Sequence, residues 1–212
     1  MRVDIWSDLV CPWCYIGKRR FERALASFDH RASVTLVHRA FQLNPAAPRD
    51  QQTDRRAMLM RKYRLTAGQA QDMDARMTDV AAAEGLQYHL AGTVSGNTAD
   101  GHQLVHLARE QGRQDTMLER LYRAYFVEQR SIFDRDSLVT LAEEEGLDAA
   151  SVAEALRENR YAAAVEQDVE AARRLGISGV PFFLIDERVA LSGAQSPDVF
   201  LDALTHHHSV GL

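Results

Sequence analysis

Both cysteines of the chain stand three positions apart, as Cys11 and Cys14 of the motif CPWC. Pro12 suits the first position of a helix, so we expect Cys11 at the helix start and Cys14 one turn further. Unpaired N–H groups and the positive dipole at a helix N-terminus stabilise a thiolate, which favours Cys11 as a nucleophile. Cys14, nearer the interior, would then resolve the mixed disulfide, since one turn brings both sulfurs into bonding range.

The same pair of thiols has two other interpretations. A CxxC motif can supply two of four zinc ligands, but the chain has no third cysteine, and structural zinc needs further ligands at comparable spacing. The histidines at 206–208 could complete such a site only if the C-terminus folded back onto the first helix. Two inert core thiols are the other alternative, although Pro12 fits an exposed junction better than a core position. We therefore predict a redox pair and no metal ion.

A second chemical signal lies far along the chain in SGVPFF, where Pro181 directly precedes an apolar run. A cis X-Pro bond there would let the backbone of Val180 lie beside the cysteines and pair with an extended substrate peptide. The pattern is weak alone, because most X-Pro bonds are trans, but it gains weight from the CPWC motif. We expect Pro12, Trp13, Val180 and Pro181 to bind substrate.

Strands and a helix are needed to position these residues. Alternating and β-branched residues predict strands at 2–6 and 33–41. Apolar residues at helical spacing predict a helix over 12–28 between them. Such a βαβ unit should hold two parallel strands joined by a right-handed crossover.

After the second strand, residues 45–159 read as helical almost throughout. Thr66 and Gln69 have the spacing of a capping box. Further N-caps are expected at polar residues that precede helical runs. These are Asp115, Asp134, Asp148 and Asn159.

Strand character returns near the C-terminus, where two apolar runs flank residues 186–188 as a hairpin would. Ser196 and Pro197 then predict the start of a last helix. The order β-α-β, helical block, β-β-α is the one used by the thioredoxin fold. We predict an α/β protein in which residues 1–44 and 160–212 form a thioredoxin-like domain with a mixed four-stranded sheet, and residues 45–159 form a large all-helical insertion.

Composition and charge exclude several classes of protein. The chain of 212 residues is 46% hydrophobic and 26% charged, as an ordinary globular protein is. Its formal net charge of -5 argues against a nucleic-acid binder. Asp4 and Asp8 interrupt the stretch where a signal peptide needs an apolar run, and no segment is long enough to span a membrane. We therefore expect a cytoplasmic protein, in which a close cysteine pair is rarely structural.

Five stretches of the chain together resemble the DsbA-like thioredoxin proteins of the FrnE type. They are SDLVCPWCYIGKRRFE, FQLNP, NTADGHQLVHLA, GISGVPFFLID and LSGAQSPDVFLDAL. The resemblance implies a thioredoxin domain with an inserted helical domain, Cys11 as nucleophile, Cys14 as resolving thiol and Pro181 as the cis-proline. Periplasmic DsbA oxidants carry histidine where this chain has Trp13, so the resemblance also implies a less oxidising couple.

The same superfamily includes glutathione-dependent isomerases of the 2-hydroxychromene-2-carboxylate type and kappa-class glutathione transferases. These proteins commonly carry serine where Cys11 stands, so the two cysteines favour disulfide exchange. The leading hypothesis is a thiol-disulfide oxidoreductase or isomerase that acts on protein or small-molecule disulfides and dithiols and is recycled by an external thiol reductant or oxidant.

Two other functions stay open from the sequence. The first is a glutathione-dependent isomerase or transferase for an aromatic or polyketide-like compound, with the glutathione carboxylate at Ser196. The second is a redox sensor or metal-binding module without turnover. No tightly bound cofactor is expected, because the chain has no G-x-G-x-x-G fingerprint, and glutathione is a candidate co-substrate. A homodimer is one option for the oligomeric state.

Overall fold

The computed structural model describes residues 1–210, and the chain folds as two compact units. The first unit consists of Met1–Leu43 and Glu166–Leu212, and the second consists of Asn44–Val165. The first boundary lies next to the expected one. The second lies later than residue 160, inside the helix α8 (Ala162–Arg174), where no turn or glycine could mark it. Within residues 1–210, no helix is long and apolar enough to cross a membrane.

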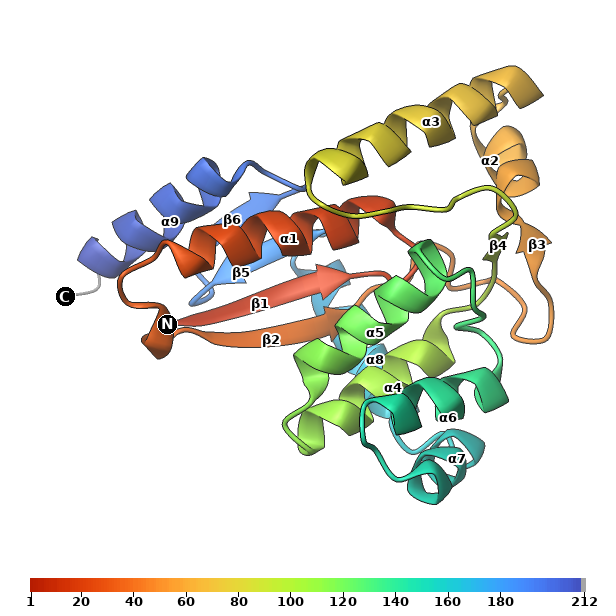
Figure 1. Cartoon of the computed structure of the whole chain (residues 1–212). Helices are drawn as coiled ribbons and strands as arrows, with labels where there is room; N and C mark the ends of the chain where they lie inside the picture. Colours follow the sequence, from red (N-terminus) through yellow and green to blue (C-terminus); the bar gives the residue numbers. More distant parts are fainter. Residues whose placement is uncertain (211–212) are drawn as a thin grey trace. The chain divides into compact units, whose positions relative to one another are not determined.

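A mixed four-stranded sheet with the order β2-β1-β5-β6 forms the centre of the first unit (Figure 1). The strands are β1 (Arg2–Ser7), β2 (Thr35–Ala40), β5 (Phe182–Ile185) and β6 (Val189–Ser192). β1 is parallel to β2, whereas β1 with β5 and β5 with β6 are antiparallel. The register pairs Ile5 with His38 on one side and with Phe183 on the other. The predicted thioredoxin-like α/β fold is thereby confirmed.

Two helices, α1 (Pro12–Ala26) and α9 (Pro197–Val210), pack against one face of this sheet (Figure 1). Three phenylalanines join the layers, because the ring of Phe21 lies 5.3 Å from that of Phe183 and 5.3 Å from that of Phe200. The buried core of this face consists of Val3, Ile5, Phe21, Ala24, Phe28, Phe183, Ile185, Phe200 and Leu204. Burial of such side chains stabilises the fold by roughly 1.5–3 kcal/mol each.

The opposite face of the sheet is covered by the part of α8 that belongs to the first unit. Successive side chains of a strand point to opposite faces, so Trp6 of β1 packs away from α1, with Ala172 and Ile177. The indole nitrogen of Trp6 donates a hydrogen bond to the backbone oxygen of Asp168 at 3.0 Å.

Two buried carboxylates share one arginine beside this contact. Nε of Arg39 lies 2.8 Å from Oδ1 of Asp4, and Nη1 of Arg39 lies 2.9 Å from Oδ1 of Asp168. The other oxygen of Asp168 accepts the N–H of Ala40 at 2.9 Å. These groups tie α8 to β1 and β2, and the two hydrogen-bonded carboxylates hold the pKa of Arg39 above its usual value despite partial burial.

The second unit is helical apart from one short strand pair. Its helices are α2 (Arg55–Tyr63), α3 (Ala67–Ala83), α4 (Ala99–Glu110), α5 (Gln114–Phe126), α6 (Arg135–Glu144), α7 (Ala149–Arg157) and the start of α8. The strands β3 (Thr53–Asp54) and β4 (Val94–Ser95) pair antiparallel. The insertion was predicted to be all-helical, and it also contains this strand pair. The sequence did not indicate the pair, because two-residue strands are too short to produce an alternating pattern.

The helix starts in this unit follow local capping chemistry in most cases. Thr66 and Gln69 form the predicted capping box, and Asp134 and Asp148 accept hydrogen bonds from the amides three residues on. Asp115 is instead the second residue of α5, where it faces the positive helix end. The prediction for Asn159 was also wrong.

Asn159 lies three residues before α8 and has a φ of 51°. Its backbone oxygen accepts the N–H of Ala162 at 3.0 Å. The side-chain oxygen accepts hydrogen bonds from Arg49 and Arg135. The residue therefore makes a turn and binds two guanidinium groups, which occupy the oxygen that a cap would use.

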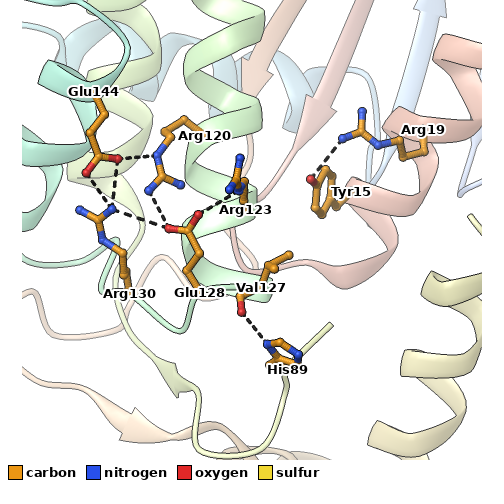
Figure 2. Close-up of polar contacts among 9 residues, drawn as sticks. All are labelled: Tyr15, Arg19, His89, Arg120, Arg123, Val127, Glu128, Arg130 and Glu144. Carbon is orange, nitrogen blue, oxygen red and sulfur yellow. Dashed lines mark hydrogen bonds and ion pairs between the residues drawn. The ribbon is translucent and has the colours of Figure 1, made fainter. Parts of the chain in front are cut away.

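A network of ion pairs joins α5 to α6, as Figure 2 shows. Nη2 of Arg120 lies 2.6 Å from Glu128, and Nε lies 2.8 Å from Glu144. Arg123 pairs with Glu128 at 2.9 Å, and Arg130 pairs with Glu144 at 2.8 Å. The Arg120 side chain is only 9% exposed, so its two carboxylate partners offset the cost of burying its charge.

Candidate functional site

The two cysteines lie where β1 gives way to α1. Cys11 is the N-cap residue of α1, with an extended backbone (φ -87°, ψ 111°), and Pro12 occupies the first helical position. The N–H of Cys11 donates to the oxygen of Asp8 at 3.1 Å, and the N–H of Cys14 donates to the oxygen of Cys11 at 3.0 Å. Two successive turns therefore carry the chain from Asp8 to Cys14 and present both thiols on one side.

Both thiols are buried, with exposed fractions of 5% for Cys11 and 2% for Cys14. Pro12 is half-buried and its neighbour Trp13 is 41% exposed, whereas the two cysteine residues on either side of them are buried. The burial of the two cysteines therefore does not distinguish a redox pair from inert core thiols. The contact that Cys11 makes with a distant segment of the chain argues against inert thiols.

That segment contains Val180 and Pro181, whose peptide bond is cis. The sulfur of Cys11 lies 3.6 Å from the backbone oxygen of Val180, although 169 positions separate the two residues in the sequence. Pro181 leads directly into β5, the antiparallel neighbour of β1. The sheet thus brings together the two motifs that the sequence singled out, CPWC and VPFF.

The environment of Cys14 disfavours its charged form. Burial raises the pKa of the Cys14 thiol well above its ordinary value, and the hydrogen bond and negative charge of Cys11 raise it further. A hydrogen bond with the backbone of Asp8 acts in the opposite direction, and the negative charge of Asp8 adds to the increase. Cys14 is therefore a protonated thiol at neutral pH, which suits a residue that acts second.

Gly17 is a residue of this site that the sequence analysis missed. A Cβ atom on Gly17 would lie 2.8 Å from Cγ of Pro181 and 3.5 Å from Ala194. Only glycine lets the second turn of α1 approach the proline so closely. The signal was present, because glycine in the middle of a helix costs stability and often marks a close packing contact.

The segment 192–196 contacts both Pro181 and α1. The N–H of Gly193 donates to the oxygen of Pro181 at 2.8 Å, and Arg20 of α1 donates to the oxygen of Ala194 at 2.6 Å. These contacts account for the position of the SGAQ stretch, which begins at the last residue of β6. They hold the proline segment against the helix that carries the cysteines.

Asp8 is the second residue of the site that sequence reasoning missed. It is 1% exposed, and its Oδ2 accepts the N–H of Leu43 at 2.7 Å. A buried acidic residue three positions before a reactive cysteine could have been singled out, because carboxylates are almost never fully buried without a partner. One of its partners is the backbone amide of Leu43, and the sequence gives no pattern for that contact.

Ser196 lies at the start of α9, as predicted, and its hydroxyl accepts the N–H of Val199 at 3.4 Å. The histidines near the C-terminus have other neighbours than the cysteines. Nε2 of His207 lies 2.9 Å from Oδ2 of Asp186, and the ring of His208 stacks on His30 at 4.0 Å. Among the described residues, no group of three or more His, Cys, Asp or Glu side chains could hold a metal ion.

A thioredoxin-like sheet, a CPWC pair at the start of its first helix and a cis-proline opposite the first cysteine define a class of thiol-disulfide proteins. In agreement with this, residues 2–205 match the model of the DsbA-like thioredoxin domain, and the chain belongs to this family.

Three individual proteins are similar over nearly the whole chain. A solved structure described as a probable DsbA oxidoreductase, SCO1869 from Streptomyces coelicolor, has a TM-score of 0.93 and 45% identity, and covers 97% of this chain and 89% of that one. The uncharacterised protein YwbO of Bacillus subtilis (strain 168) is 29% identical, covering 97% of this chain and 96% of its own. The cytosolic disulfide reductase DsbM from Pseudomonas aeruginosa has a TM-score of 0.70 and 21% identity, and covers 99% and 100%, which shows a shared fold.

Proposed function

We propose that the protein is a thiol-disulfide oxidoreductase in which Cys11 attacks and Cys14 resolves. In the first step the Cys11 thiolate attacks a substrate disulfide, forms a mixed disulfide and releases one substrate thiol. In the second step Cys14 loses its proton and attacks the sulfur of Cys11, which releases the second substrate thiol. The substrate is reduced and the protein gains a Cys11–Cys14 disulfide, and an external thiol returns the pair to its reduced form.

The observation that carries this proposal is the 3.6 Å contact between Sγ of Cys11 and the backbone oxygen of Val180. Structural thiols in a core pack against apolar side chains. Here the first thiol of a CxxC motif faces a main-chain polar group at the edge of β5 instead. An extended substrate strand could pair with this segment and place its own sulfur next to Cys11.

The exposed side chain of Trp13 supports a broad substrate range. Trp13, which is 41% exposed, offers an apolar surface next to the nucleophile without a charge that would select a particular partner. We therefore propose protein disulfides or dithiols as well as small-molecule disulfides as substrates. An isomerase cycle would use the same first step, followed by return of the mixed disulfide to another substrate thiol.

Glutathione is the thiol that we propose for recycling. The neighbour DsbM has also been solved with GSH, in a structure with a TM-score of 0.68, 19% identity and coverage of 99% and 100%. In this chain the N-terminus of α9 at Ser196 offers N–H groups and a positive dipole end for a carboxylate. The cytosolic setting of DsbM also supports our proposal of a cytoplasmic location.

A redox titration tests the proposal. Purified protein is equilibrated in glutathione buffers of graded ratio, free thiols are alkylated, and intact mass counts them. We expect a single transition between two free thiols and none. Cys14→Ser should instead accumulate one mixed disulfide at Cys11, whereas Cys11→Ser should accumulate none. A protein whose two thiols stay free at every ratio would contradict the proposal.

The glutathione-dependent isomerase or transferase predicts a different result for the same variant. Such an enzyme uses the thiol of glutathione and does not need a closing disulfide. Cys14→Ser would then keep full turnover while glutathione remained essential. Under the redox proposal, Cys14→Ser loses its disulfide-reducing turnover and stops at the mixed disulfide.

A further inference from the structure

The end of α2, in the second unit, is exposed and positively charged. Its last helical residues and its C-cap residue are Arg61, Lys62, Tyr63 and Arg64, and all four are exposed. One turn of α-helix contains about 3.6 residues, so four consecutive exposed residues mean that this end of α2 is accessible on every side. Tyr63 is 52% exposed, more than Trp13 beside the nucleophile. We call these four residues the basic tip.

The three cations of the basic tip have no acidic partner. In the part of the chain that the structure describes, Arg61, Lys62 and Arg64 make no ion pair and no side-chain hydrogen bond. The ammonium group of Lys62 lies 5.5 Å from the centre of the Tyr63 ring, which is its one aromatic contact there. The formal net charge of the chain is -5, so this local excess of positive charge is opposite in sign to that of the whole protein.

The contacts that fasten α2 lie at its other end. Arg55 and Asp74 are both buried and form an ion pair that joins α2 to α3, its neighbour in Figure 1. The N–H of Arg55 also donates to the oxygen of Thr93 at 3.0 Å. Asp54 caps the helix and accepts the N–H of Ala57 at 2.7 Å. Substitutions in the basic tip therefore leave all of these contacts in place.

Arg64 stands at a position where the backbone favours glycine. Its φ of 55° and ψ of 43° are left-handed, a conformation that is strained for a residue with a Cβ atom and that glycine usually supplies at a helix end. Gln129 has the same φ, but its side chain donates a hydrogen bond to the oxygen of His89. The helix dipole favours cations near the end of α2, yet it does not require one at a residue with this backbone.

Methionines adjoin the basic tip. Met58 and Met60 of α2 and Met73 and Met77 of α3 are half-buried, and the two on α3 are one turn apart and share a face. Unbranched thioether side chains adapt to different partners, and methionine-rich surfaces are typical of proteins that bind several sequences. Cations, an exposed aromatic ring and methionines together fit a polypeptide that carries carboxylates next to apolar side chains.

We propose that the basic tip and the adjoining methionines bind an acidic segment of a partner protein. Guanidinium groups pair with carboxylates through two parallel hydrogen bonds, and an apolar side chain of the segment would pack on Tyr63. A nucleic acid fits less well, because three cations neutralise few phosphates and the net charge of the protein opposes binding. This inference goes beyond the proposed redox function and does not depend on it.

Fluorescence anisotropy tests the proposal. A labelled peptide of glutamate residues around a central phenylalanine, without cysteine, is titrated with the reduced, full-length protein. The triple variant Arg61→Gln, Lys62→Gln, Arg64→Gln removes the three charges and keeps long polar side chains. We expect its affinity for the peptide to be about tenfold lower than that of the native protein, and added salt should weaken the native complex. A peptide with glutamine in place of glutamate should not bind.

Two further variants separate the basic tip from net charge and from stability. Arg109→Gln, Arg157→Gln, Arg188→Gln removes three exposed cations elsewhere and should keep the native affinity. Arg64→Gly should lower the affinity about threefold, as the loss of one exposed ion pair would. Because glycine suits the left-handed backbone, Arg64→Gly should unfold at the same or a higher urea concentration than the native protein. A lower concentration would mean that Arg64 stabilises the fold, which would contradict the proposal.

Other outcomes would also overturn it. If the native protein does not bind the acidic peptide, or binds the glutamine peptide equally well, the surface does not recognise carboxylates. Equal losses of affinity in the two triple variants would mean that only net charge matters. Tighter binding of a labelled single-stranded DNA that also depends on the basic tip would assign the surface to nucleic acid. Because the peptide has no cysteine, a failed redox titration would contradict the redox function and leave these results unchanged.

Discussion

Gly17 of α1 and Pro181 before β5 approach so closely that a single methyl group would not fit between them. A Cβ atom on Gly17 would lie 2.8 Å from Cγ of Pro181. The residue that faces Cys11, Val180, directly precedes this proline. The position of the proline segment beside the nucleophile therefore depends on a residue that carries no functional group.

Gly17→Ala should destabilise the protein and slow the reaction of Cys11 with a disulfide. Alanine is intrinsically favoured over glycine inside a helix by about 1 kcal/mol, so a net loss of stability must come from the contact with Pro181. The control is Gly68→Ala in α3, where nothing lies within 4 Å of the added atom. Urea unfolding and the rate of mixed-disulfide formation measure both effects, and equal behaviour of the two variants would contradict the prediction.

Trp13→His should make the cysteine couple more oxidising. An imidazolium next to Cys11 could donate a charged hydrogen bond to its thiolate, which stabilises the reduced protein and raises the potential. We expect an increase of about 30 mV or more, a tenfold change in the equilibrium constant with glutathione. Trp13→Phe removes the indole without adding a donor and serves as the control. Identical potentials for the histidine and phenylalanine variants would show that the donor has no effect.

The stability of the reduced protein should fall at alkaline pH because of Cys14. Its pKa is raised in the folded state, so above the ordinary thiol pKa of about 8.5 the unfolded chain loses a proton that the folded protein keeps. Stability from this group is thus complete below that pH and declines as the pH rises towards the folded value. Urea unfolding at graded pH should show the decline in the reduced protein and not in Cys14→Ser. A decline of equal size in both would point to another group.

Arg39→Met should destabilise the first unit by about 3 kcal/mol, since it removes a partner from two buried carboxylates. Those carboxylates, Asp4 and Asp168, have side chains only 5% and 2% exposed. Both tryptophans of the chain, Trp6 and Trp13, lie in this unit, so their fluorescence reports its unfolding in urea.

The matched control for this prediction is an exposed ion pair on α8. Arg173 lies 3.4 Å from Glu170, with side chains 66% and 48% exposed. Surface pairs of this kind contribute roughly 0–1 kcal/mol, so Arg173→Met should have little effect. If Arg39→Met cost no more than Arg173→Met, the buried network would not stabilise the unit.

Much of the fold could be predicted from periodicity and turn residues. The strands at both ends of the chain alternate or carry β-branched runs, and the helix of the CPWC motif begins at a proline. Boundaries with a local chemical cause, such as the capping box at Thr66, were also predictable. The structural features that the sequence did not predict have no cause in the local sequence. The unit boundary inside α8 falls within a continuous helix, and β3 and β4 are too short to form a pattern.

The candidate site shows the same division. Cys11 and Cys14 could be predicted from their spacing, and Pro181 could be predicted from its position before a strand. Asp8 and Gly17 do not, because the role of each depends on a partner that only the folded sheet brings near. Asp8 accepts a hydrogen bond from the amide of Leu43, and Gly17 lies against Pro181. A sequence pattern reports what a residue does to its own helix or strand more readily than what it meets across the fold.

The strand order has a consequence for how the chain folds during its synthesis. β1 pairs with β2 early in the chain, but its other neighbour, β5, follows the entire second unit. On the ribosome, Asn44–Val165 can therefore fold while half of the sheet is still missing. During that time the cysteine pair has emerged and its support at Val180 has not been made. A nascent chain that stalls before β5 would carry the CPWC motif without the segment that faces it, exposed to any oxidant in the cell.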